Sequence, residues 1–174
     1  MNDTPKFIGY GRQEIDQKDI SAVLDVLNGD YLTQGPVVER FEGALAECVG
    51  AKYAVACSNG TAGLHLSCLA ADLKPGSTGV TTTMSFAASA NCMLYTKMNV
   101  DLLDIDTQSI GLSTDQLKSY ITEKDPNLIL PVHYAGLASN SREIKEIAGS
   151  RIVIEDACHS LGGQLREWSP RWIW

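Results

Sequence analysis

From about residue 50 onward, short apolar runs typical of buried strands alternate with longer runs typical of helices. We expect strands at residues 53–57, 79–82, 100–105, 128–132 and 151–154, and helices at residues 60–71, 86–95, 113 onward and 141–147. This alternation indicates an α/β domain with a mostly parallel sheet covered by helices. The 174 residues are enough for one such domain with a real core.

Two further helices are expected before this alternation. The first covers residues 16–27, where the apolar residues fall on one helical face: Ile20, Val23, Leu24 and Leu27. The second begins near Pro36, because proline suits the first turn of a helix, and stops at Gly50. We therefore expect an N-terminal helical segment at residues 1–50 and a partial α/β domain at residues 51–165.

Residues 166–174 form a tail of different character. The tail contains all three tryptophans of the chain and does not continue the alternation. A truncated or frame-shifted product would look like this, and so would a natural aromatic tail that packs on the domain. We interpret it as an aberrant tail.

Composition narrows the classes of function. The formal net charge of -7 and the pI of about 4.9 argue against a nucleic-acid binder, which normally carries a basic face. They do not exclude a site for a small anion, because backbone groups can bind phosphate on an acidic protein.

The five cysteines are scattered through apolar runs without CxxC spacing, so we expect reduced, buried thiols in a cytoplasmic protein. Residues 1–11 show no signal peptide, and no apolar run approaches the roughly 18 residues of a membrane span.

Polar or aromatic residues follow four of the expected strands. In open α/β sheets, ligands bind beyond the carboxyl ends of the strands, so we expect these four segments to meet at one edge. They are Ser58-Asn59-Gly60-Thr61-Ala62, Ser85-Phe86, His133-Tyr134 and Asp156-Ala157-Cys158-His159.

The first of these segments has the ingredients of a phosphate site. Gly60 permits a tight turn, and the N–H groups of Thr61 and Ala62 would be free at a helix N-terminus, whose dipole favours an anion. The Thr61 hydroxyl adds another donor. The alternative is a plain helix cap formed by Ser58 or Asn59.

The other segments offer groups for a flat cofactor. Asp156 could keep a pyridine nitrogen protonated, which makes the ring an electron sink, or it could be a surface residue or helix cap. Phe86 could stack on the ring or belong to the core. His159 could be catalytic, packed or exposed, and His133 could contact a ligand or hold a loop.

Other chemistries lack a signal in the sequence. No GxSxG, Walker or GxGxxG motif occurs, and no two histidines have the spacing of metal ligands. His65 lies in an apolar helical run and is expected to be structural.

Taken in order, the motifs of this chain resemble the N-terminal half of the DegT-type nucleotide-sugar aminotransferases. The resemblance runs from about residue 8 to residue 164. The matching segments are Tyr10-Gly11-Arg12-Gln13, Leu32-Thr33-Gln34-Gly35-Pro36, Phe41-Glu42, Ser58-Asn59-Gly60-Thr61-Ala62, Ser85-Phe86-Ala87-Ala88-Ser89-Ala90-Asn91, Asp104-Ile105-Asp106, Pro131-Val132-His133-Tyr134-Ala135-Gly136 and Glu155-Asp156-Ala157-Cys158-His159. The first two look most like the PseC-like branch, UDP-4-amino-4,6-dideoxy-N-acetyl-altrosamine transaminases of pseudaminic acid synthesis.

The resemblance implies the large domain of the aspartate-aminotransferase fold (fold type I), truncated here, with pyridoxal 5'-phosphate as cofactor. It also implies a cytoplasmic homodimer that transfers an amino group from L-glutamate to a nucleotide-linked 4-keto-6-deoxy sugar, without nucleic-acid or membrane partners.

The resemblance also assigns roles to individual residues. Gly60, Thr61 and Ala62 would hold the cofactor's phosphate. Phe86 would stack on the ring, Asp156 would pair with the ring nitrogen, and His159 would lie beside the cofactor. Thr33 and Gly35 would lie near the substrate.

The chain departs from the family pattern at its end. The family's Schiff-base lysine lies in a downstream Ser-Phe-His-Pro-x-Lys segment, which these 174 residues do not contain, and the small C-terminal domain is also missing. We therefore expect cofactor binding without turnover, and poor solubility. The alternatives are a related sugar 3-dehydratase, in which histidine replaces the lysine, and a non-catalytic module that binds pyridoxal phosphate.

Overall fold

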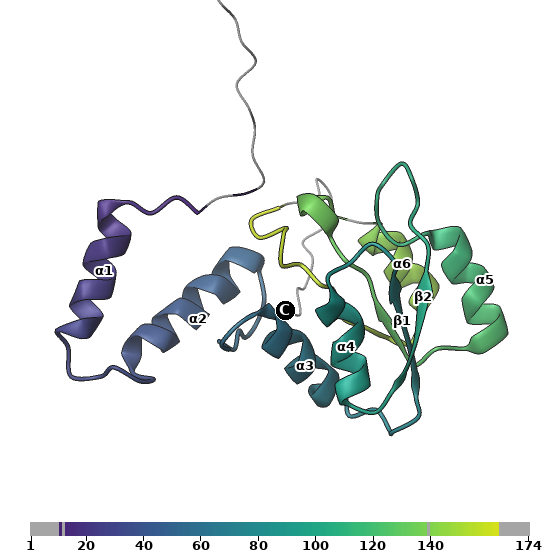
Figure 1. Cartoon of the computed structure of the whole chain (residues 1–174), viewed down its shortest axis with the longest axis horizontal. Coiled ribbons are helices and arrows are strands. Elements are labelled where there is room, and N and C mark those ends of the chain that lie inside the picture. The colour runs from purple at the N-terminus through teal and green to yellow at the C-terminus, as the bar shows by residue number, and fades with distance from the viewer. Residues whose placement is uncertain (1–10, 12, 139, 164–174) are drawn as a thin grey trace, which may run out of the picture. The chain divides into compact units, whose positions relative to one another are not determined.

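The computed structural model describes residues 11, 13–138 and 140–163. The described helices and strands follow one another as α1 (Gln17–Leu27), α2 (Pro36–Val49), α3 (Gly60–Ala70), β1 (Thr78–Thr82), α4 (Ala87–Tyr95), β2 (Asn99–Leu103), α5 (Thr114–Lys124), β3 (Leu128–Leu130), the 3-10 turn η1 (Tyr134–Gly136), α6 (Ser141–Ala148) and β4 (Ile152–Val153). The expected alternation of strands and helices is confirmed from α3 onward (Figure 1). The tail at residues 166–174 lies outside the described residues, so the interpretation of it stays a prediction.

The chain divides into two compact units, Met1–Arg40 and Phe41–Trp174. In the first, Asp16 caps α1 by accepting hydrogen bonds from the N–H groups of Lys18 and Asp19. The Asp19 carboxylate returns a bond to the Asp16 N–H, which completes a capping box. None of the residues of α1 is buried, so no described residue of this unit fully covers its apolar stripe.

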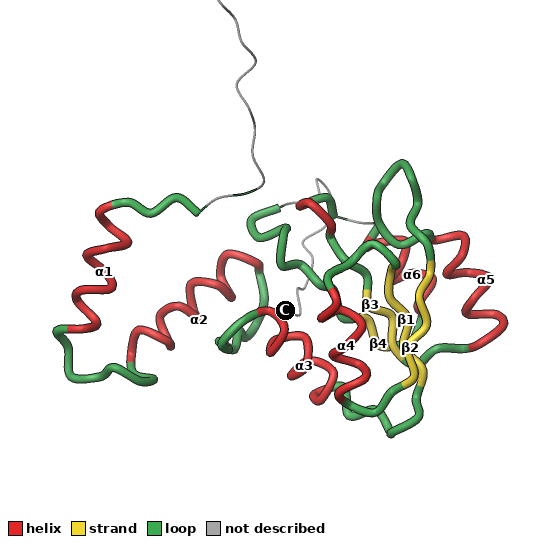
Figure 2. The backbone as a smooth tube through the Cα atoms, viewed as in Figure 1, coloured by secondary structure: helices red, strands yellow, loops and turns green. Residues whose placement is uncertain are grey.

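The second unit contains a four-stranded parallel sheet in the order β2-β1-β3-β4 (Figure 2). Helices α3 and α4 cover one face, and α5 and α6 cover the other (Figure 1). Parallel strands need such crossover helices, and a central parallel strand is apolar on both faces. Strand β3 shows this directly, because all three of its residues are fully buried.

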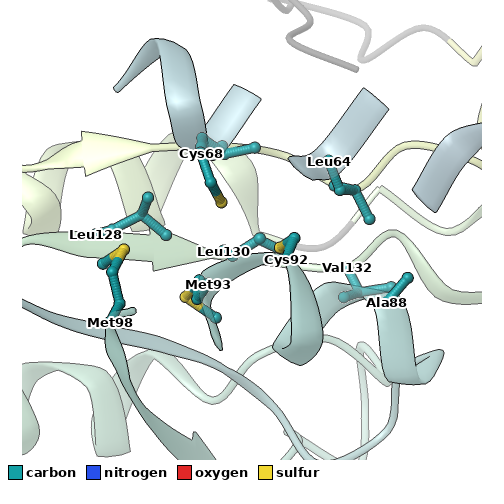
Figure 3. Packing of buried hydrophobic residues seen from close by; sticks show 10 residues of the cluster. Leu64, Cys68, Ala88, Cys92, Met93, Met98, Leu128, Leu130 and Val132 are labelled. Atoms are coloured by element: carbon teal, nitrogen blue, oxygen red, sulfur yellow. The ribbon is translucent and has the colours of Figure 1, made fainter. Parts of the chain in front are cut away.

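Each face of the sheet has its own hydrophobic core. Leu128 and Leu130 of β3 point to the side of α3 and α4, where they pack with Leu64, Cys68 and Met93 (Figure 3). Ile129, one residue out of phase, belongs to the core on the other side. The period of two along the strand therefore divides the apolar residues between the two cores.

Gly79 in β1 is required by the first core. A Cβ atom at this position would collide with the Sδ atom of Met93 and would also lie 3.2 Å from Cε of Met98. The absence of a side chain at Gly79 lets α4 pack directly on the sheet.

One expected strand is absent. Residues 53–57 form no strand, and Tyr53 and Val55 are 75% and 78% exposed. The prediction was wrong because a strand needs a neighbour with free backbone groups, and this segment pairs with none of the described strands. Instead, the N–H of Ala56 donates to Oε1 of Glu42, 2.7 Å away.

Two smaller expectations are also corrected. Ser113 and Gln116, three residues apart at the start of a helical run, have the sequence pattern of a capping box. Ser113 caps α5 by accepting from the Gln116 N–H, but the Gln116 side chain accepts from the Asp104 N–H instead of closing the box. The N–H of Asp104 follows the end of β2 and competes for that oxygen. All five cysteines are free, as expected, yet only Cys68 and Cys92 are buried.

Candidate functional site

The carboxyl ends of β3 and β4 bring two of the predicted segments together. Beyond the regular strands, Val132 and Asp156 form an isolated parallel bridge. The Asp156 N–H donates to the carbonyl of Pro131 at 2.9 Å, and the His133 N–H donates to the carbonyl of Asp156 at 3.0 Å. Asp156 is therefore held by its backbone at the edge of the sheet where ligands bind in α/β proteins.

The carboxylate of Asp156 is almost fully buried, with 5% of the residue exposed. Its Oδ2 atom accepts a hydrogen bond from the Ser89 hydroxyl at 2.7 Å. Its Oδ1 atom accepts from the Cys158 N–H at 3.3 Å. Buried carboxylates need such donors, so the interpretation of Asp156 as a surface residue is wrong.

The N-terminus of α3 supplies backbone donors. Asn59 is the cap: its Oδ1 accepts from the Ala62 N–H at 2.9 Å, and its carbonyl accepts from the Gly63 N–H. The N–H of Ala62 is thus not free, contrary to our expectation, because a good cap residue occupies it. The N–H groups of Gly60 and Thr61 belong to the first turn and have no acceptor within the helix.

Gly60 joins this turn to the Asp156 segment. A Cβ atom on Gly60 would lie only 2.8 Å from the Sγ atom of Cys158. The two segments are far apart in sequence and are in close contact here. The pKa of the Cys158 thiol is raised to about 12, first by partial desolvation of its sulfur atom and then by the neighbouring carboxylate of Asp156. Cys158 therefore stays a neutral thiol at this contact.

The aromatic residues lie around the same edge. Phe86 occupies the N-cap position of α4 and is 73% exposed, so its ring is not part of the core. His159 is also exposed and lies edge-on to the ring of Tyr134, with 6.1 Å between the ring centroids. Both are accessible to a bound molecule.

His133 has a structural role. It is completely buried, with Nε2 3.7 Å from Oε1 of Glu155. Burial lowers the pKa of His133 to about 4, and the nearby charge of Asp156 raises it by less. A neutral, inaccessible histidine fits the interpretation in which His133 holds the loop, not the one in which it contacts a ligand. His65 packs edge-on against Tyr95, which agrees with its expected structural role.

The two residues predicted to lie near the substrate belong to the other compact unit. Thr33 and Gly35 lie between α1 and α2, in the unit Met1–Arg40. Gly35 has a φ of +85°, and a Cβ there would lie 2.8 Å from Cβ of Tyr31. The turn therefore explains why position 35 is a glycine, and a role of Gly35 near the substrate stays a prediction.

Two residues of the site were missed. Ser89 and Cys158 both contact the Asp156 carboxylate, and neither was singled out. A signal for Ser89 was available, because it lies three residues after Phe86 and hence on the same side of the expected helix.

Comparison with known proteins identifies the family. The sequence pattern of the DegT/DnrJ/EryC1/StrS aminotransferase family matches residues 13–169. The chain belongs to this family. It is 35% identical, over 92% of its length, to an uncharacterised protein of Methanocaldococcus jannaschii and to the UDP-4-amino-4-deoxy-L-arabinose–oxoglutarate aminotransferase of Shewanella sediminis. It covers 42% of the length of each of these relatives.

Solved structures of sugar-modifying enzymes have the same fold. A GDP-4-keto-6-deoxymannose-3-dehydratase with a trapped PLP-glutamate geminal diamine matches with a TM-score of 0.83 and 27% identity, over 90% of this chain and 42% of that one. Spr1654 of Streptococcus pneumoniae, named as a sugar aminotransferase, matches in its PMP form with a TM-score of 0.83 and 23% identity, over 94% of this chain and 46% of that one. These matches confirm the expected fold of the pyridoxal-phosphate aminotransferases. Pyridoxal phosphate is the cofactor of the family.

Two further observations concern the described residues. None of the helices among them is long and apolar enough to cross a membrane. The same residues contain no group of three or more His, Cys, Asp or Glu side chains that could hold a metal ion.

Proposed function

We propose that this chain carries the cofactor-binding part of a nucleotide-sugar aminotransferase that uses pyridoxal phosphate. The reaction transfers an amino group from L-glutamate to a nucleotide-linked 4-keto-6-deoxy sugar, as in pseudaminic acid or related surface-polysaccharide synthesis. The observation that supports this most is the contact between Gly60 and Cys158, which unites a helix N-terminus with a buried carboxylate.

The residues present fit the cofactor at both of its ends. The N–H groups of Gly60 and Thr61 and the Thr61 hydroxyl would hold the phosphate, helped by a helix dipole effect of about 0.3–1 kcal/mol. The carboxylate of Asp156 would accept a hydrogen bond from the protonated ring nitrogen. Phe86 would cover one face of the ring and shield it from water, and His159 would lie beside it.

The cofactor, when bound, supplies an electron sink for chemistry at the amino-acid carbon. The part of this chain in that chemistry is to orient the ring and to hold a proton on its nitrogen through Asp156. A charge-assisted hydrogen bond of this kind contributes about 1.5–3 kcal/mol. We further propose that the chain alone does not turn over, because the Schiff-base lysine is not among its 174 residues, and that the complete enzyme is a cytoplasmic homodimer.

The test is calorimetric titration of the chain with pyridoxal phosphate and with pyridoxal. The proposal expects Asp156→Asn to weaken both affinities about tenfold or more. The matched control is Asp106→Asn, since Oδ1 of Asp106 accepts bonds from the N–H groups of Gln108 and Ser109, which an asparagine side-chain oxygen can also accept. Equal affinities for the two variants would overturn the proposal.

A second candidate is the related sugar 3-dehydratase, which the solved dehydratase structure at 27% identity favours. The two candidates differ at the position of the Schiff-base lysine, where a histidine indicates the dehydratase. Sequencing the encoding DNA in all three frames beyond the codon of Trp174 decides between them. If neither the lysine-containing nor the histidine-containing segment follows, the remaining hypothesis is a non-catalytic module that binds pyridoxal phosphate.

A further inference from the structure

The hydroxyl of Ser89 makes a buried link between two distant parts of the chain. Ser89 lies in the first turn of α4, is completely buried, and donates to Oδ2 of Asp156 at 2.7 Å. The two residues are 67 positions apart in sequence. This bond therefore exists only when α4 and the segment after β4 are correctly packed.

Ser89 differs from the other donors to this carboxylate. Cys158 donates from its backbone N–H at 3.3 Å, but it is only two residues from Asp156 and moves with it. Ser89 donates from a different element, helix α4. It is thus the residue that can fix the carboxylate relative to the rest of the site.

The same helical turn carries Phe86. The N–H of Ser89 donates to the carbonyl of Phe86 at 3.0 Å, so the two residues form one rigid turn. Ring stacking by Phe86 and placement of Asp156 by Ser89 would then come from a single piece of backbone.

We propose that Ser89 is a positioning residue for the cofactor's ring nitrogen. Its hydroxyl occupies Oδ2 of Asp156 and prevents the carboxylate from rotating. The remaining acceptor capacity of the carboxylate is thereby held in one direction. This inference rests on the proposed function, because it takes Asp156 as the partner of the ring nitrogen.

The test uses Ser89→Ala in the full 174-residue chain, with pyridoxamine 5'-phosphate and inorganic phosphate as probes. Neither probe needs a lysine. Inorganic phosphate reports only on the turn at Gly60 and Thr61, whereas the ring of pyridoxamine 5'-phosphate also reports on Asp156. We expect Ser89→Ala to weaken binding of pyridoxamine 5'-phosphate about fivefold to tenfold, with the affinity for phosphate unchanged.

The matched control is Thr81→Val. Thr81 is also completely buried, and its hydroxyl donates to the carbonyl of Leu130 at the same 2.7 Å, away from Asp156. We expect this variant to lose stability without changing the ratio of the two affinities. Ser89→Thr keeps the hydroxyl and is expected to restore the ratio.

The outcomes separate the two proposals. If Asp156→Asn weakens binding of pyridoxamine 5'-phosphate and Ser89→Ala does not, the positioning role alone is overturned. A Ser89→Ala variant that loses affinity for both probes equally shows a structural role and overturns it too. If the wild-type chain binds neither probe, or Asp156→Asn changes nothing, the proposed function is overturned together with the inference.

Discussion

The close approach of Gly60 to Cys158 makes a sharp prediction at the scale of single residues. In Gly60→Ala, the new Cβ would lie 2.8 Å from Sγ of Cys158, so the turn or the thiol must move. We expect a loss of about 1–3 kcal/mol in the free energy of unfolding and weaker binding of inorganic phosphate. Chemical denaturation and calorimetric titration measure the two effects.

A matched variant isolates the contact. Gly43→Ala adds the same methyl group in α2, where no atom lies within 4 Å, and is expected to be neutral or slightly stabilising. Combining Gly60→Ala with Cys158→Ala should restore phosphate binding because it removes the obstructing sulfur. Equal behaviour of the two alanine variants would contradict the prediction.

The lowered pKa of the buried His133 leads us to predict that the stability of the chain depends on pH. Its pKa is lowered to about 4 in the folded chain from the ordinary 6.5, so between these values the unfolded chain binds a proton that the folded chain does not. The free energy of unfolding therefore falls as the pH drops from about 6.5 toward 4. At pH 5, this contribution is roughly 2 kcal/mol.

Glu155 has the opposite effect on stability. Burial raises its pKa, so as the pH falls the folded chain takes up this proton at a higher pH than the unfolded chain, which stabilises the folded state. The test therefore compares two proteins by urea denaturation, the wild-type chain and His133→Asn, in which Glu155 is retained. The quantity compared is the change in the free energy of unfolding between pH 7 and pH 5. The wild-type chain should lose more stability than the variant over this interval. Parallel profiles would show that His133 does not titrate in this way.

The residues of the site could be predicted from the sequence only as far as their types and places along the chain. Asp156 and Gly60 were recognisable because each follows a strand-like run. The bond from Ser89 was not, since it depends on how α4 packs against the end of β4, 67 residues away. The occupied N–H of Ala62 was missed because cap and phosphate site use the same short segment.

At the scale of elements, the regular helices and strands followed from local pattern, and the failure at residues 53–57 is informative. This segment is a short, fully apolar run of the kind that forms buried strands, but backbone pairing is a property of two segments and cannot be read from one. The described sheet ends at β2 on one side and at β4 on the other, and residues 53–57 pair with neither strand.

The exposed segment predicts an asymmetry between two valines. Val55 is 78% exposed, whereas Val80 in β1 is completely buried. We expect Val55→Thr to change the free energy of unfolding by less than about 0.5 kcal/mol. The same substitution at Val80 should cost roughly 1–3 kcal/mol, because the new hydroxyl is buried in the core of α5 and α6. Urea denaturation compares them.

Val55→Thr should also reduce self-association, since it removes an apolar side chain from an unpaired segment. Sedimentation at increasing concentration measures this, with Val80→Thr as the variant that should not help. A cost at Val55 equal to that at Val80 would show that the segment is covered in solution.

At the scale of the whole molecule, the chain spans 42% of the length of the relatives it matches, yet it forms both cores of its sheet. Under the proposed function, the residues that bind the cofactor lie in this chain and the lysine that links to the cofactor does not. The positions of two described lysines can be compared directly with that of Asp156.

Lys74 and Lys97 lie at the opposite edge of the sheet from Asp156. The carbonyl of Lys74 accepts from the Ser77 N–H just before β1, and the carbonyl of Lys97 accepts from the Gly76 N–H, next to the start of β1 and β2. Lys52 lies over the ring of Tyr53. Neither Lys74 nor Lys97 is therefore placed to link covalently to a cofactor whose ring meets Asp156.

We therefore expect the chain, incubated with pyridoxal phosphate and reduced with borohydride, to carry no dominant adduct on any one lysine, and to transfer no amino group from glutamate to a keto-sugar. Peptide mass spectrometry after reduction measures the first, with pyridoxamine 5'-phosphate, which cannot form the link, as the background control. Pyridoxal phosphate should still bind reversibly, because the proposed phosphate-binding turn at Gly60 and Thr61 and the carboxylate of Asp156 are both present. A stoichiometric adduct at Lys52, Lys74 or Lys97 that Asp156→Asn abolishes would show that this chain supplies its own Schiff-base lysine.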